Sequence, residues 1–168
     1  MDLALLDVVA RWLHIVGVVV WMGHNYVNVV QRPSFKPLAI NDPEGALREQ
    51  VLGAMKREHA VFRHASLVVL ATGLFMLWYR DILVETVTLS GGFAVLGAGI
   101  WIAILMVLNL WLVLWPHQKK VLGFVEASVE ERMRCSRITF LSSRTNTILS
   151  VPAIFLMVAG AHGGLWSG

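Results

Sequence analysis

The 168-residue chain has a single cysteine, Cys135, and only 15% of its residues are charged. One cysteine excludes a disulfide framework, a CxxC metal or redox motif and the CxxCH attachment site of a c-type haem. A glycine-rich nucleotide loop, a nucleophile elbow and an HExxH motif are also missing from the sequence. These absences argue against a nucleotide-dependent enzyme, a serine hydrolase and a zinc protease.

Acidic residues are missing from the interior of the long apolar runs, where only Asp7 lies inside one, near its start. Paired-carboxylate catalysis and proton coupling through a buried acid both need such residues, so neither is expected. The net charge of +3 does not favour a nucleic-acid partner, because most Lys and Arg lie between the apolar runs. The amino terminus lacks a basic region and a small-residue cleavage site, so we interpret the first run as a retained membrane span.

The chain does contain long runs of apolar residues, and 57% of its residues are hydrophobic. A helical span needs about 20 apolar residues, and four runs satisfy this, at 5–30, 60–79, 92–115 and 145–161. Each span must be helical, since lipid offers no partner for an open backbone. Pro33 and Pro116 are expected to end the first and third helices. We therefore predict one domain, 1–168, that is an all-α integral membrane four-helix bundle.

Two connections between spans are long enough to hold structure of their own. The first has a helix-start pattern at Asp42-Pro43-Glu44, followed by an apolar side at Ala46, Leu47, Val51, Leu52 and Met55. The other, between the third and fourth spans, places Val121, Phe124, Val125 and Val129 against charged residues. We predict two short amphipathic interfacial helices, one in each of these cytoplasmic loops.

The basic residues predict the orientation of the bundle. Five Lys or Arg lie between the first two spans and six between the last two, whereas the middle connection has Arg80 alone. Because an excess of Lys and Arg marks cytoplasmic loops, both termini are expected on the periplasmic side. The predicted location is a bacterial inner membrane, as a multi-pass protein with the lipid bilayer as its surroundings.

The first span carries an unusual polar stripe. Six positions fall within an arc of roughly 140° on a helix: Arg11, His14, Trp21, His24, Asn25 and Asn28. Polar groups in a span normally face protein or a cofactor. Asn25, Asn28 and Asn109 could equally be interhelical hydrogen-bonding residues.

The depth of each histidine suggests a cofactor. His24 lies about 9 Å and His64 about 7 Å from the inner surface, at 1.5 Å per residue. Two neutral imidazoles on facing helices are what a six-coordinate haem b requires, so this pair is the predicted haem-iron ligand set. Arg63 could hold a haem propionate or extend to the interface. Trp21 is deep enough to lie beside a porphyrin.

The other histidines have weaker claims on a cofactor. His14, near mid-membrane, is a second candidate metal site with Met76 or Met157 as partner, or a helix–helix contact. His117 could replace an inner-side ligand. Both His117 and His59 are placed at the membrane–water interface, where we expect solvated side chains.

Three stretches resemble the urate oxidase N-terminal membrane domain family. They are RWLH at 11–14 with WMGHNY at 21–26 and Asn28, then NLW at 109–111 with WPHQKK at 115–120, and SRTNT-x-LSVP at 143–152 with FLM at 155–157. Larger members join such a membrane domain to a cytochrome c and are linked to urate oxidation. Here His117 replaces an expected Asn, and no CxxCH is present.

The resemblance and the histidines together lead to three hypotheses. The first is a haem b-binding redox protein, either an oxidoreductase or its electron-transfer subunit, that works with another membrane redox subunit or a cytochrome c, or as a homo-oligomer. A cofactor-free accessory or assembly subunit of a larger membrane complex is the second. An independent urate-type oxidase is the weakest, since it rests on family likeness alone.

Overall fold

The computed structural model describes residues 2–31 and 45–163, and the regular structure within these ranges is entirely helical. In order, the elements are α1 (Leu3–Gln31), α2 (Gly45–Tyr79), α3 (Leu83–Val87), η1 (Gly91–Phe93), α4 (Ala94–Leu108), η2 (Asn109–Leu114), α5 (Trp115–Val121) and α6 (Val129–Ala161). Four stretches of the described chain are long and apolar enough to cross a membrane, at Leu3–Val27, Met55–Tyr79, Gly91–Val121 and Val129–Ala161. The predicted all-α bundle with four spans is confirmed.

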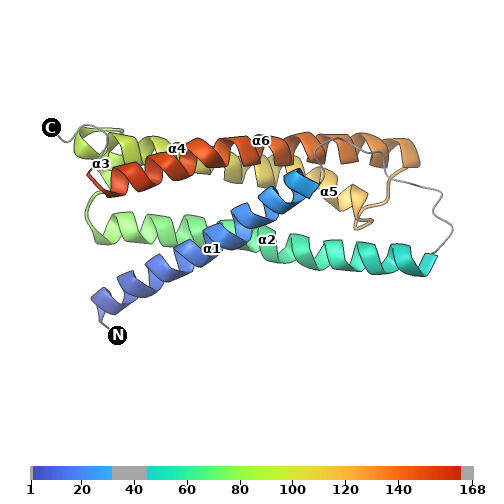
Figure 1. Ribbon diagram of the computed structural model, residues 1–168, viewed down its shortest axis with the longest axis horizontal. Helices are drawn as coiled ribbons and strands as arrows, with labels where there is room; N and C mark the ends of the chain where they lie inside the picture. The colour runs from blue at the N-terminus through green and yellow to red at the C-terminus, as the bar shows by residue number, and fades with distance from the viewer. Residues whose placement is uncertain (1, 32–44, 164–168) are drawn as a thin grey trace.

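The spans pack as two hairpins. α1 lies along α2, and the continuous rod of α4, η2 and α5 lies along α6, with sparser contacts of α1 to α6 and of α2 to α4. Figure 1 shows α1 crossing α2 obliquely, and shows α1 beginning at the same end of the bundle at which α6 ends. We call the opposite end the basic end, because it carries Lys56, Lys119 and Lys120.

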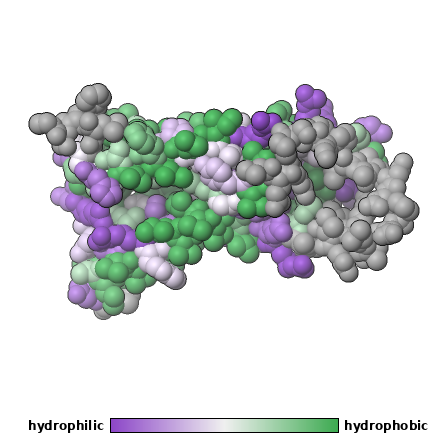
Figure 2. All heavy atoms as spheres, viewed as in Figure 1, coloured by the Kyte–Doolittle hydropathy of each residue, from purple (hydrophilic) through white to green (hydrophobic). Residues whose placement is uncertain are grey.

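A small core joins the two hairpins while most of the span surface stays exposed. The buried cluster combines Trp21 and Met22 of α1 and Phe62 and Val69 of α2 with Met106, Val107, Leu110, Leu114 and Ala153. Outside it, large apolar side chains such as Ile15, Val19, Leu112 and Ile148 are exposed. Figure 2 shows hydrophobic residues over much of the middle of the visible face and hydrophilic ones toward its ends. Such a surface suits the hydrocarbon layer of a bilayer.

Glycines let the helices of each hairpin approach closely. A Cβ at Gly160 of α6 would lie 2.5 Å from the backbone nitrogen of Leu96, and one at Gly99 would lie 3.0 Å from Met157. In the other hairpin, a Cβ at Gly17 would lie 2.8 Å from Val69 Cγ2. Small residues at helix contacts are the usual means of tight packing inside membranes.

Neither predicted interfacial helix is a separate element: α2 and α6 each begin in the connection before their span, and residues 122–128, which include Phe124 and Val125, are not helical. α6 begins at Val129 rather than near 145, because Ser128 caps it: the Ser128 hydroxyl accepts a hydrogen bond from the Glu131 N–H at 3.2 Å. α2 runs unbroken from Gly45 to Tyr79. The expected start at Asp42-Pro43-Glu44 lies outside the described residues, as do the side chains of 45–54.

Pro116 does not end the third span, contrary to expectation. The helix continues through α5 to Val121, and the turn that precedes the proline, η2, is a π-helix. Proline removes one backbone donor and crowds the carbonyl four residues earlier, here that of Leu112. A wider π-turn relieves that crowding and lets the helix proceed. Pro33 lies outside the described residues.

Candidate functional site

The polar stripe of α1 meets α2 near the basic end, where two histidine rings lie together. The ring centroids of His24 and His59 are 5.7 Å apart, with planes at 72°. Phe62, nearly one turn after His59, stacks on His24 at 4.6 Å and meets His59 edge-on at 5.7 Å. The two imidazoles are thus held by one aromatic ring between facing helices.

Buried N–H groups surround this histidine pair. Trp21 is fully buried and Asn25 is almost so. The Trp21 indole nitrogen, the Asn25 amide nitrogen and His59 Nδ1 are all buried without a hydrogen-bond partner among the described residues. A buried donor left unpaired costs about 1–3 kcal/mol. Each such group needs an explanation, and an acceptor from outside the described residues is one. We call Trp21, His24, Asn25, His59 and Phe62 the histidine cluster.

The predicted pairing of His24 with His64 is not the arrangement found. His64 is exposed, its ring lies 6.4 Å from that of Trp111, and its Nδ1 bonds the Ala60 carbonyl at 2.7 Å. His59 and His64 point about 140° apart on α2, since each residue adds about 100°. The depth estimate therefore paired His24 with a histidine that lies on another face of α2. His59, which we expected to be solvated, lies against His24 in its place. The side chain of Asn28 lies outside the described residues.

His14 makes a helix–helix contact at mid-span. Its Nδ1 lies 3.1 Å from the Thr72 hydroxyl, which itself donates to the Val68 carbonyl at 2.6 Å. With that hydroxyl hydrogen directed at Val68, the His14 tautomer that carries its proton on Nδ1 fits this contact. A Cβ on Gly73 would come within 3.2 Å of the His14 ring, so the glycine makes room for it. The described residues contain no group of three His, Cys, Asp or Glu placed to hold a metal ion.

Arg63 and His117 lie near the basic end of the bundle. The Arg63 guanidinium carbon is 3.6 Å from the ring centroid of Trp115 and 5.6 Å from that of Trp111. His117 Nδ1 bonds the carbonyl of Val113, four residues earlier, at 2.6 Å, and its ring is half-buried. Arg63 thus turns toward α5 and η2.

A polar network joins the two helices of the second hairpin. It includes Asn109, for which an interhelical hydrogen-bonding role was one of the alternatives. The Asn109 side-chain amide donates to Asn146 Oδ1 at 2.8 Å and to the Ser142 carbonyl at 3.1 Å. Ser142 donates back to Asn109 Oδ1 at 3.0 Å, and Asn146 donates to the Met106 carbonyl at 3.1 Å. Asn109 is therefore an interhelical hydrogen-bonding residue.

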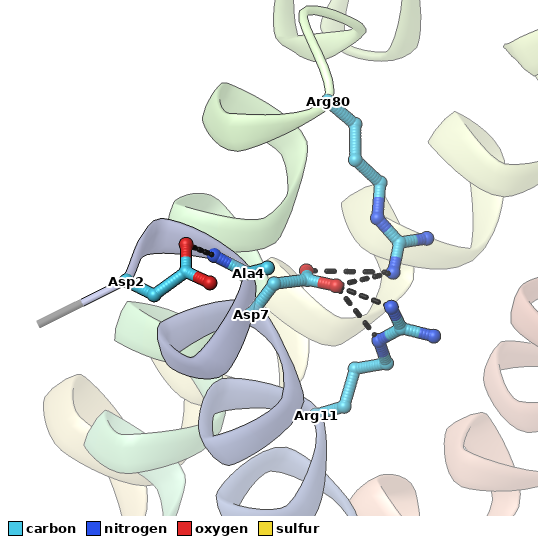
Figure 3. Close-up of polar contacts among 5 residues, drawn as sticks. All are labelled: Asp2, Ala4, Asp7, Arg11 and Arg80. Atoms are coloured by element: carbon cyan, nitrogen blue, oxygen red, sulfur yellow. Dashed lines mark hydrogen bonds and ion pairs between the residues drawn. The ribbon is translucent and has the colours of Figure 1, made fainter.

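At the end opposite the basic end, one buried carboxylate joins two arginines (Figure 3). Asp7 accepts from Arg11 Nε at 3.0 Å within α1, and Arg80 Nη2, just after α2, lies 3.5 Å from both of its oxygens. The Asp7 side chain is 4% exposed. The i, i+4 spacing of Asp7 and Arg11 is visible in the sequence, but the reach of Arg80 is not, because it depends on how α1 crosses α2.

The fold and the apolar surface define the class: a polytopic helical bundle of the membrane, with its polar groups gathered between helices. The family profile described as Urate oxidase N-terminal matches residues 46–167, which is most of the chain, and the protein belongs to this family. The match covers α2 to α6, whereas α1, with His14 and His24, precedes it. No curated protein and no solved structure matches the chain.

Proposed function

We propose that this protein is a haem b-binding electron-transfer protein of the membrane, with His24 and His59 as the iron ligands. The observation that carries the proposal is the approach of these two imidazoles, one from each of two facing helices, to a centroid separation of 5.7 Å. A pair of neutral histidines is a sufficient axial set for haem b, and the core of a helical bundle is a common place for it.

The surrounding residues fit such a group. The unpaired N–H donors of Trp21 and Asn25 suit the carboxylates of a porphyrin, which accept hydrogen bonds. Phe62 fixes the plane of His24 by stacking and keeps apolar surface against the site. Bound haem would supply one-electron exchange, and the chain's own residues would set its polarity and access.

The proposal includes an orientation and a partner. The basic end faces the cytoplasm, because the connections at that end carry the excess of Lys and Arg. Both termini then face the periplasm. The histidine cluster then lies in the inner leaflet of a bacterial inner membrane. An electron partner is another membrane redox subunit or a cytochrome c, the latter because this chain has no CxxCH of its own.

The test is the absorption spectrum of the detergent-purified full chain, reduced minus oxidised. We expect a haem b spectrum that is lost in both His24→Ala and His59→Ala and kept in His64→Ala and His117→Ala, the matched controls at the same end. A folded, colourless wild-type protein overturns the proposal. Loss in His64→Ala with retention in His59→Ala would instead restore the ligand pair predicted from depth.

The second candidate is a cofactor-free accessory subunit, and one observation favours it. His64 and His117 bond their own helices, and His14 bonds Thr72, so these three imidazoles are accounted for by structure. A colourless protein that co-purifies with a larger membrane complex would establish this role.

A further inference from the structure

Three basic side chains at the basic end gather around two aromatic rings. Lys56 Nζ lies 5.0 Å from the ring of Phe124, Arg63 lies 3.6 Å from that of Trp115, and Lys119 Nζ lies 5.9 Å from the same Trp115 ring. The two rings are neighbours, with centroids 6.0 Å apart. We call these five residues, from α2, α5 and the segment after α5, the basic–aromatic cluster.

Among the side chains that the structure describes, which exclude those of 32–54, the three cations have no carboxylate partner. The ion pairs there join Asp7 to Arg11 and Arg80 and join Lys120 to Glu131. Arg63 Nε and Nη1 are covered by protein atoms and have no acceptor among the described residues. Cation–π contact offsets part of the desolvation of a guanidinium but provides no acceptor for its hydrogens. The unsatisfied chemistry is that of a site for an oxyanion.

The position of the basic–aromatic cluster along the spans indicates which kind of oxyanion it would bind. Lys56 stands at the start of the second apolar stretch, Met55–Tyr79, and Lys119 near the end of the third, Gly91–Val121. Both therefore lie where hydrocarbon gives way to head groups, the depth at which tryptophan is enriched and lipid phosphates are found. A guanidinium matches phosphate oxygens in geometry and charge, and basic pockets between spans bind anionic head groups.

We propose that Arg63, Lys56 and Lys119 bind the phosphate of an anionic phospholipid at the basic end. Arg63 and the two lysines supply positive charge and N–H donors, and Trp115 lies against the guanidinium. The inference is independent of haem, because it uses α2 and α5 and none of the histidine cluster. It also assigns Arg63 to lipid rather than to a haem propionate.

The test begins with the wild-type chain in detergent micelles supplemented with phosphatidylglycerol or, at equal amount, phosphatidylcholine. Thermal unfolding should shift upward with phosphatidylglycerol and not with phosphatidylcholine, and native mass spectrometry should show retained phosphatidylglycerol. Equal shifts with both lipids overturn the proposal. A comparable shift with inorganic phosphate alone identifies a free anion as the ligand and also overturns it.

Variants locate the effect. Arg63→Gln should weaken phosphatidylglycerol retention about tenfold, the loss expected for one charge-assisted hydrogen bond. The matched control is Arg137→Gln, which removes the same charge from an exposed position of α6. Should Arg63→Gln fail to fold, Lys56→Gln and Lys119→Gln are measured in its place. Unchanged lipid retention in the cluster variants, or an Arg63 effect seen only on haem content, refutes the assignment.

Discussion

Replacing Asp7 with asparagine should loosen the end of the bundle opposite the basic end. The substitution keeps the shape of the side chain and one acceptor oxygen but removes the charge that faces Arg11 and Arg80. Arg11 belongs to the same helix, whereas Arg80 follows α2, so the carboxylate is also a cross-link between the two helices of the first hairpin. Without it, two guanidiniums face each other across a neutral group.

The magnitude follows from burial and geometry. A hydrogen bond to a charged group contributes about 1.5–3 kcal/mol. The side chains of Arg11 and Arg80 are 56% and 41% exposed, so water screens part of each interaction. We therefore expect Asp7→Asn to lower the free energy of unfolding by about 1–2 kcal/mol, which corresponds to roughly 2–8 °C in Tm for a chain of this size. Arg80→Gln should cost less, because Arg11 still pairs with Asp7.

Thermal unfolding in detergent, followed by far-UV circular dichroism, measures the difference. Asp2→Asn is the matched control, because Asp2 is an exposed residue immediately before the same helix, and its carboxylate oxygen accepts a hydrogen bond from the Ala4 N–H. That bond survives in asparagine, so Tm should be unchanged. A Tm for Asp7→Asn equal to or above that of the wild type, or one no lower than that of Asp2→Asn, would refute the reasoning.

Two further predictions concern the second hairpin. Asn146→Ala removes a fully buried amide that bonds both Asn109 and a backbone carbonyl of α4, and should cost about 1–3 kcal/mol in unfolding free energy; the exposed neighbour Thr145→Ala should cost far less in the same urea or thermal titration. Gly160→Ala places a Cβ 2.5 Å from the Leu96 backbone and must push α4 from α6, lowering Tm, whereas Gly23→Ala in α1 meets nothing within 4 Å and should raise helix stability slightly. Equal Tm changes in the two glycine variants would show that the α4–α6 contact is not tight.

The sequence is sufficient for the number and type of the spans, because membrane helices are selected by length and hydrophobicity alone. The sequence predicts the first and last residues of these helices less well. Residues 129–144 are too charged to be counted as a span, yet the Ser128-x-x-Glu131 capping signal was present and marks the start of α6. Pro116 alone predicts the end of a helix, because the π-turn that precedes it has no simple sequence signature.

Part of the candidate site could also be predicted from the sequence, and part depends on the tertiary structure. Depth along a helix follows from 1.5 Å per residue, so the sequence could place a histidine of α2 near the level of His24. Which histidine of α2 faces His24 depends on the crossing of the two helices, a tertiary property, and the structure selects His59. The environment of Arg63 likewise depends on the contact of its guanidinium with Trp115 of α5, a tertiary contact that no local pattern encodes.

The division into two hairpins has a consequence for biosynthesis. α1 and α2 bury their closest contacts against each other, and α4 and α6 do the same, while contacts between the hairpins are fewer. Sequence-local contacts form early and at little entropic cost. The first hairpin can therefore pack in the bilayer as soon as Tyr79 has left the ribosome, before the second exists. All residues of the histidine cluster belong to α1 and α2, so the two ligands of the haem site proposed above would be present at that stage, before the second hairpin is made.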